Sequence, residues 1–241
     1  MEPIKKRITD YWTNRAEGFK EQRIHEFNNE KRQRWLAELR RLVPGGRKLR
    51  VLDLGTGTGF FAFVMAGEGH EATGIDLTPN MIECARETAE LLGIKAEFHL
   101  MDAEQPAFEP ESFDVLLTRN LTWTLPHLEK AYKAWYRLLA PGGVLINFDA
   151  DYCRALESDD EVELPENHAH KLVDPGLMAE NESITMEVGA YQMARPQWDV
   201  QLLIEAGFEK VTVDTGIHRR IYSEIDEFYN PVPIFGIAAY K

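Results

Sequence analysis

Three glycines at alternate positions, Gly55, Gly57 and Gly59, follow directly on the apolar stretch from Leu49 to Leu54. A short apolar run that ends in glycines predicts a buried strand, and the apolar residues Phe60 to Gly67 predict a helix after the loop. Glycines between a strand and a helix let a ligand approach the backbone and the helix N-terminus. This feature favours an α/β fold with a ligand at the loop.

Strand and helix patterns alternate five times after residue 48, which predicts parallel strands with right-handed crossovers. The five expected strands are Leu49–Leu54, Ala72–Ile75, Ala96–Met101, Phe113–Thr118 and Val144–Phe148. Intervening helices are expected at 60–67, 79–92 and 128–139, with Pro141-Gly142-Gly143 closing the last of them. A helix at Trp198–Ala206 and strands at Lys210–Asp214 and Pro233–Tyr240 follow.

We expect one domain over residues 1–241 with four parts. Residues 1–48 form amphipathic helices that cover the site, and residues 49–150 form the ligand-binding core. Residues 151–196 interrupt the alternation, carry many acids, and are interpreted as an insertion of short helices that acts as a lid. Residues 197–241 supply the last helix and two strands.

The net charge of −13 argues against a protein whose main ligand is nucleic acid. Residues 1–50 nevertheless hold 14 Lys and Arg against 7 Asp and Glu, which leaves an RNA or protein ligand as an alternative. With two cysteines, no secretory signal and no apolar stretch long enough to span a bilayer, we expect a cytoplasmic protein without membrane segments.

Acidic residues stand at the ends of successive expected strands. Asp53 precedes the glycine loop, Asp76 ends the second strand, and Asp102 ends the third. The two oxygens of a carboxylate such as Asp76 match a ribose diol, and Asp102 can accept from an exocyclic adenine amine. The alternate spacing of the glycines differs from the G-x-G-x-x-G more usual in dinucleotide binders.

These motifs resemble the ordered motifs of class I S-adenosylmethionine-dependent methyltransferases. The resemblance lies in Val51–Gly59 (VLDLGTGTG), Gly74–Leu77 (GIDL), Met101–Glu104 (MDAE) and Leu138–Gly143 (LLAPGG). It implies a Rossmann-like, seven-stranded, mostly parallel sheet with helices on both faces and an antiparallel last strand.

The resemblance also implies which residues contact the cofactor S-adenosylmethionine. Gly55 and Gly57 approach its methionine part, Asp76 binds ribose, Leu77 packs on adenine, and Asp102 and Ala103 bind the adenine edge. The complete expected set is Trp12, Asp53, Gly55, Thr56, Gly57, Asp76, Leu77, Asp102, Ala103 and Asn120. Trp12 either contacts the cofactor in this way or packs in the core.

Candidates for contacting the acceptor follow the fourth and fifth strands, where open α/β sheets place their ligands. Arg119 and Trp123 are candidate acceptor contacts, Asn120 is a candidate catalytic residue, and Asp149 is a candidate for both roles.

Several methyltransferase subclasses and a metal site are disfavoured by the sequence. The segment Arg119–Trp123 lacks the Asn-Pro-Pro-Tyr pattern of nucleobase and glutamine amino methylation, and no Pro-Cys dipeptide supports cytosine-carbon chemistry. A strand ending in Arg119 disfavours the metal-dependent catechol type. His168 and His170 alternate in a way that can chelate, but no helical pair or cysteine supports them, so we expect a solvated loop and no metal.

The sequence therefore predicts methyl transfer from S-adenosylmethionine to a small-molecule acceptor by direct displacement. The alternatives are an RNA or protein methyltransferase that uses the basic N-terminal segment, and a nicotinamide-dependent oxidoreductase that uses the same loop. The acceptor atom stays open between oxygen, nitrogen, sulfur and carbon, and the oligomeric state stays open as well.

Overall fold

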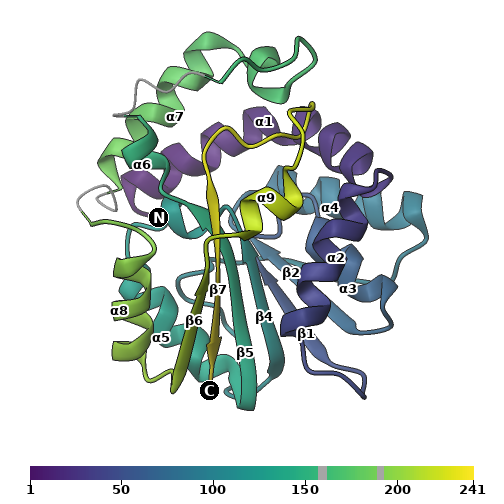
Figure 1. The fold of residues 1–241 in the computed structure, drawn as a ribbon, viewed down its shortest axis with the longest axis vertical. Helices are drawn as coiled ribbons and strands as arrows, with labels where there is room; N and C mark the ends of the chain where they lie inside the picture. The colour runs from purple at the N-terminus through teal and green to yellow at the C-terminus, as the bar shows by residue number, and fades with distance from the viewer. Residues whose placement is uncertain (157–161, 189–192) are drawn as a thin grey trace.

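A single mixed sheet of seven strands organises the chain in the computed structural model, which describes residues 1–156, 162–188 and 193–241. The strand order is β3-β2-β1-β4-β5-β7-β6; β7 runs antiparallel to β5 and β6, and the other neighbouring strands pair in parallel (Figure 1). The strands are β1 Arg50–Leu54, β2 Glu71–Asp76, β3 Glu97–Leu100, β4 Phe113–Arg119, β5 Leu139–Ala150, β6 Lys210–Asp214 and β7 Ile234–Tyr240. The expected sheet, with its antiparallel last strand, is confirmed.

Helices cover both faces of the sheet and bury an apolar core on each. The core that contains Trp35, Phe61 and Phe148 lies under α2, α3, α4 and α9, and the core that contains Trp135 and Leu203 lies under α5 and α8. The covering helices are α2 Lys31–Leu42, α3 Phe60–Gly67, α4 Pro79–Leu92, α5 Leu128–Leu138, α8 Gln197–Ala206 and α9 Ile217–Ile221. Burial of these apolar faces is the main favourable term that holds the layers together.

One expected boundary is wrong. The Pro141-Gly142-Gly143 stretch, which we expected to close a helix, belongs to β5, which already begins at Leu139. Gly142 takes a positive φ of 75° and its N–H donates to the carbonyl of Lys241, while the Lys241 N–H donates to the carbonyl of Gly143. Pairing with the chain terminus therefore extends the strand beyond its apolar part.

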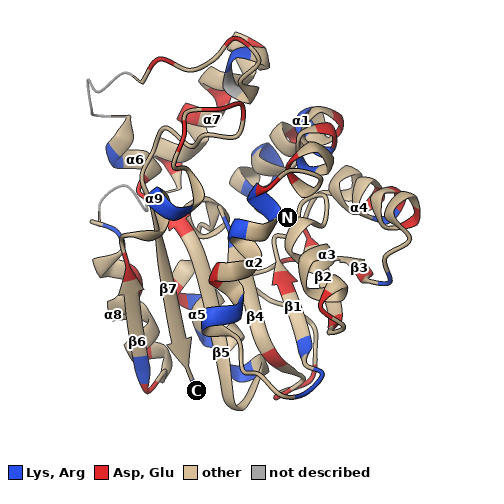
Figure 2. Ribbon diagram, turned by 45° about the vertical axis from the view of Figure 1, so that its right-hand side comes forward, with Lys and Arg blue, Asp and Glu red and all other residues tan. Residues whose placement is uncertain are grey.

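The N-terminal helix α1 (Pro3–Phe27) and the helix α7 (Pro175–Glu187) lie beyond the carboxyl ends of the parallel strands (Figure 1). Arg7 of α1 donates to both carboxylate oxygens of Glu180 at 2.8 and 3.0 Å and to the Ser183 hydroxyl at 2.9 Å. These contacts join the N-terminal segment to the insertion. Helix α1 carries charged residues of both signs, whereas the charged residues of α7 are all acidic (Figure 2).

The insertion contains α6 (Tyr152–Ala155), the 3-10 helix η2 (Ala169–Leu172) and α7, so one of its helices, at 13 residues, is longer than expected. Part of the acidic run expected in the lid, residues 157–161, lies outside the described residues, as do residues 189–192. No helix in the described parts of the chain has the length and apolarity needed to cross a membrane. The short 3-10 helix η1 (Thr122–Thr124) follows β4.

Candidate active site

The glycine loop between β1 and α3 is held from behind by Asp53. Its carboxylate accepts from the Thr56 hydroxyl at 2.6 Å and from the Ala62 N–H at 3.1 Å. Gly55 and Gly57 have φ of 62° and 54°, a left-handed conformation that suits glycine. Burial raises the pKa of Asp53 to about 7, against the opposing effect of its hydrogen bonds.

Asp76 ends β2 beside this loop. Its carboxylate accepts from the Gly57 N–H at 3.0 Å and from the Thr78 N–H at 2.8 Å, so it ties the loop to the N-terminus of α4. Burial raises the pKa of Asp76, while these backbone hydrogen bonds act in the opposite direction. The side chain lines the cavity above the loop, where its oxygens can also accept from a ligand.

Asp102, after β3, meets the first turn of α1. Lys5 donates to Asp102 at 2.6 Å and also forms an ion pair with the buried Glu104. Burial lowers the pKa of Lys5, but the two carboxylates outweigh it, so the net shift is upward. The backbone carbonyl of the neighbouring Ala103 accepts from the Trp135 indole at 2.7 Å, which anchors this strand end to α5.

All the residues expected to contact the cofactor line one cavity of about 140 Å³ above the glycine loop. They are Trp12, Asp53, Gly55, Thr56, Gly57, Asp76, Leu77, Asp102, Ala103 and Asn120. Side chains from outside the loop approach it closely: a Cβ on Gly55 would lie 2.6 Å from Leu121 and one on Gly57 would lie 3.2 Å from Phe19. We call this the cofactor cavity.

A second cavity of about 660 Å³ lies between α1, the insertion and the segment that precedes β7. Its aromatic walls are Tyr11, Trp12, Phe19, Trp123, Tyr152, Tyr222, Phe228 and Tyr229. It shares five lining residues with the cofactor cavity, namely Trp12, Phe19, Arg23, Arg119 and Asn120. We call it the acceptor cavity, because a ligand in it would meet the contents of the cofactor cavity at these shared residues.

Arg119 lies where the two cavities meet and is paired with Glu26 of α1. The guanidinium donates to both oxygens of Glu26, at 2.9 and 3.2 Å, and to the Tyr222 hydroxyl at 3.2 Å. Arg23 also pairs with Glu26. Burial alone would raise the pKa of Glu26, but the two guanidinium groups hold it at about 2. Sequence reasoning missed Glu26 and Arg23, although both lie one or two turns beyond Phe19 on the helix.

Asn120 and Trp123 lie in the turn after β4. Asn120 has a positive φ of 54°, and its side-chain oxygen accepts from the Tyr152 hydroxyl at 3.0 Å. The Trp123 indole donates to the Asn120 carbonyl at 3.0 Å, and its ring lies 5.0 Å from that of Tyr152. Trp123 is buried and also lines the acceptor cavity, so it both packs in the fold and faces the site.

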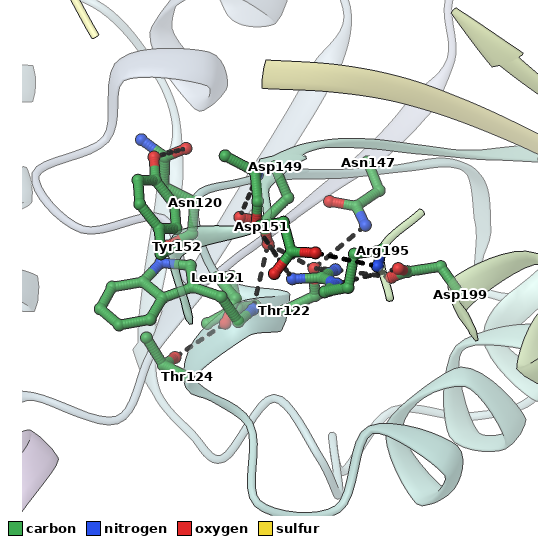
Figure 3. Close-up of polar contacts among 12 residues, drawn as sticks. Asn120, Leu121, Thr122, Thr124, Asn147, Asp149, Asp151, Tyr152, Arg195 and Asp199 are labelled. Carbon is green, nitrogen blue, oxygen red and sulfur yellow. Dashed lines mark hydrogen bonds and ion pairs between the residues drawn. The ribbon is translucent and has the colours of Figure 1, made fainter. Parts of the chain in front are cut away.

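Asp149 does not line either cavity and is fully buried. Its carboxylate accepts from the Thr122 hydroxyl and, at 3.1 Å, from the Trp123 N–H, and lies 3.5 Å from Arg195 (Figure 3). Burial raises the pKa of Asp149, and the charge of Arg195 opposes that rise. The geometry therefore directs this acid toward the turn after β4 rather than toward a ligand.

Arg195 completes this buried network from the end of the insertion. It donates to Asp199 at 2.9 and 2.5 Å and to the Thr122 hydroxyl at 2.6 Å (Figure 3). Asp199 also accepts from the Tyr132 hydroxyl at 2.6 Å. Sequence reasoning missed Arg195 and Asp199; their spacing of four residues was the only local signal for a pair.

The expectation of a solvated loop at His168 is wrong. The side chain is only 2% exposed, and its Nε2 donates to the Tyr229 carbonyl at 2.7 Å. The C-terminal segment before β7 folds back over the insertion and encloses this imidazole. The side chain of His170 lies outside the described residues. Within the described part of the chain, no group of three potential ligands is placed to hold a metal ion.

A family model described as a methyltransferase domain matches residues 46–201. The match runs from just before the glycine loop through the insertion and into α8. The chain belongs to this methyltransferase domain family. The family-level resemblance expected from the glycine loop and the strand-end acids is thereby confirmed.

Named relatives of this methyltransferase domain act on different atoms. A ubiquinone/menaquinone biosynthesis C-methyltransferase of Brucella anthropi is 30% identical over 184 residues, which cover 74% of this chain and 68% of that protein. Phosphoethanolamine N-methyltransferase 3 of Arabidopsis thaliana is 30% identical over 175 residues, which cover 72% of this chain and only 31% of the relative. A ubiquinone biosynthesis O-methyltransferase of Pseudomonas putida is 34% identical, with 55% of this chain and 54% of the relative covered. The chain thus spans only part of several relatives that it matches.

Solved structures share the fold of this domain. The S-adenosyl-L-methionine complex of Haemonchus contortus phosphoethanolamine N-methyltransferase 2 superposes with a TM-score of 0.61 at 21% identity, covering 87% of this chain and 52% of that one. A Pyrococcus horikoshii protein superposes with a TM-score of 0.59 at 21% identity, covering 89% of this chain and 93% of that one.

Proposed function

We propose that this methyltransferase domain transfers a methyl group from S-adenosylmethionine to a small-molecule acceptor by direct displacement. The observation that carries the proposal is the junction of two cavities at Trp12, Arg119 and Asn120. One cavity has the residues of a nucleoside site, and the other has the size and aromatic walls of a small-molecule site. Relatives named for ubiquinone biosynthesis and phosphoethanolamine methylation support a small acceptor.

The residues of the cofactor cavity fit an adenosyl ligand. Asp76 presents carboxylate oxygens to a ribose diol, Leu77 offers an apolar surface to a base, and the left-handed backbone at Gly55 and Gly57 admits the amino acid part. The cofactor supplies an electrophilic methyl group on sulfur. The protein's task is then to align the acceptor with that methyl at the junction, since proximity and orientation supply much of the rate in such displacements.

We assign Asn120 the role of orienting the acceptor at this junction. Its strained turn is fixed by the Tyr152 hydroxyl on one side and by the Trp123 indole on the other. We assign Asp149 the role of holding that turn through Thr122 and Trp123. The alternative is that Asp149 acts as a general base and contacts the acceptor, and stability measurements on variants decide between the two roles.

The basic N-terminal segment, which suggested an RNA or protein acceptor, is occupied largely by internal ion pairs. Arg7 pairs with Glu180, Lys20 with Glu87, and Arg40 with Glu68. Further pairs involve Lys5, Arg23, Lys31, Arg34, Arg41, Arg47, Lys48 and Arg50. Charges that are paired within the fold leave a weaker field for a polyanion, which supports a small acceptor.

Titration calorimetry with S-adenosylmethionine, S-adenosylhomocysteine and NAD tests the cofactor. We expect both adenosyl ligands to bind, NAD not to bind, and Asp76→Ala to weaken the binding at least tenfold. Asp10→Asn is the control, because Asp10 is an exposed acid whose ion pair, in the part of the chain that the structure describes, is with Lys6 on α1. Binding of NAD alone would contradict the proposal and support a nicotinamide-dependent oxidoreductase instead.

A further inference from the structure

Of the four arginines that line the acceptor cavity, three come from α1 and the end of β4. Arg15 and Arg23 lie two turns apart on α1, with Phe19 between them on the same face, and Arg119 reaches the cavity from the end of β4. The guanidinium of Arg23 lies 4.4 Å from the centre of the Phe19 ring. One wall of the cavity therefore combines positive charge with aromatic surface.

Positive charge on this wall exceeds the negative charge that pairs with it. Arg23 and Arg119 share a single carboxylate, Glu26, which is completely buried behind them. Burial and the adjacent charge of Arg119 together lower the pKa of Arg23, against the attraction of Glu26. One buried acid cannot neutralise two guanidinium groups, so the pair keeps a net positive charge.

Arg15 adds a third positive charge that the described residues do not pair. It forms no hydrogen bond or ion pair within residues 1–156, 162–188 and 193–241, and its Nε is enclosed without a partner. The Nε of Arg119 is likewise buried without a partner. Buried donors without acceptors are costly, so both guanidinium groups favour a nearby ligand with negatively charged oxygens.

The acids that line the same cavity do not compensate Arg15. Asp151 caps α6 by accepting from the Arg154 N–H at 3.3 Å, and its other oxygen accepts from the Arg195 N–H at 3.1 Å. Glu182 is exposed on α7. A fourth arginine, Arg154, also lines the cavity and is exposed.

We propose that the acceptor carries an anionic group, a carboxylate or a phosphate, and that Arg15, with the paired guanidiniums of Arg23 and Arg119, binds it. The planar guanidinium fork matches the oxygens of both groups. The aromatic walls, including Trp123 and Tyr152, contact the rest of the acceptor. This inference rests on the proposed function and narrows it to one class of acceptor.

Probe compounds matched in shape and different in charge test this inference. The full chain with bound S-adenosylhomocysteine is titrated with benzoate, phenyl phosphate and neutral benzamide, and with phosphoethanolamine and neutral ethanolamine. We expect at least one anionic probe to bind at least tenfold more tightly than its neutral counterpart. Preference for benzoate or for a phosphate distinguishes the two sources of the charge.

Variants of Arg15 assign the preference to this wall. Arg15→Gln should weaken binding of the preferred anion at least tenfold and leave the neutral probes and S-adenosylhomocysteine unaffected. Arg15→Lys should restore part of the affinity, because it keeps the charge but loses the fork. Arg219→Gln serves as the control, since Arg219 is exposed on α9 and does not line the cavity.

Three results would overturn the inference: no binding of any anionic probe, equal binding of charged and neutral probes, or unchanged anion binding in Arg15→Gln. Failure of the proposed function looks different, because the chain would then not bind S-adenosylhomocysteine at all. A chain that binds the cofactor product but prefers neutral probes would keep the proposed function and lose only the anionic acceptor.

Discussion

Lys5, in the first turn of α1, donates a hydrogen bond of 2.6 Å to Asp102 at the carboxyl end of the sheet. The same carboxylate accepts from the Glu104 N–H at 2.9 Å and lines the cofactor cavity. Helix α1 is thus fastened over the cavity by the acid that the sequence assigns to the adenine edge. A ligand amine at Asp102 would compete with the lysine.

The first prediction concerns this contact. Lys5→Met should increase both the association and the release rates of S-adenosylhomocysteine severalfold, because the helix then covers the cavity without its ion pairs to Asp102 and Glu104. Stopped-flow tryptophan fluorescence measures the rates, since Trp12 lines the cavity. Lys6→Met is the matched control, because among the described residues the ion pair of Lys6 is with the exposed Asp10. Equal changes in both variants would refute a specific role for Lys5.

The second prediction separates a positioning role of Asp149 from a base. Asp149→Asn should destabilise the fold by about 3 kcal/mol, because the buried Arg195 loses one of its two carboxylates and the Trp123 N–H loses its charged acceptor. Urea unfolding measures this loss. A variant of unchanged stability with abolished turnover would instead identify Asp149 as the base.

The third prediction compares Gly57 and Gly46, two glycines that both have a left-handed backbone conformation. Gly57→Ala should weaken S-adenosylmethionine binding more than tenfold, since the new Cβ would press on Phe19 at 3.2 Å and stiffen the loop that faces the ligand. Gly46→Ala has a similar energetic cost, because Gly46 also has a left-handed backbone with a φ of 88°, but its new Cβ would have no atom within 4 Å. Calorimetry should therefore show unchanged affinity for Gly46→Ala.

The fourth prediction concerns pH. Asp53 has a pKa of about 7 in the folded chain because of burial, well above the usual value of an unfolded aspartate. Between about pH 4 and pH 7 the folded state holds a proton that the unfolded state has released, so the free energy of unfolding should fall as pH rises through this window. Urea unfolding at pH 5 and pH 7 should show a smaller fall for Asp53→Asn than for the unaltered chain. An equal fall in the free energy of unfolding of both proteins would mean that a group other than Asp53 titrates in this window.

The glycine loop and the acids at the strand ends could be predicted because their signal is local. Asp53, Gly55 and Asp76 lie next to the apolar strands that place them, and the carboxyl ends of parallel strands necessarily meet at one edge. The extension of β5 through Gly142 was not predictable in this way. It depends on pairing with Lys241, nearly a hundred residues along the chain.

The other features that the sequence does not predict depend on contacts between residues that are distant in the chain. Nothing local in Asp149 indicates that Arg195 lies beside it, and nothing local in Arg119 indicates Glu26. The sequence predicts a solvated loop at His168 because no helical pair or cysteine supports a metal site there, yet the imidazole bonds to the Tyr229 carbonyl of the C-terminal segment. Residues whose role is set by such contacts need the folded chain to be recognised.

The hydrogen bond from the Arg195 N–H to the Asp151 carboxylate joins the two ends of the insertion at 3.1 Å. This hydrogen bond lies between the end of β5 and the start of α8, so we expect those two elements to keep their places when the insertion between them is shortened or lengthened. On the proposed function, residues of the insertion that line the acceptor cavity can then change while those of the cofactor cavity stay the same. A different acceptor can therefore be sought by replacing the insertion between Asp151 and Arg195.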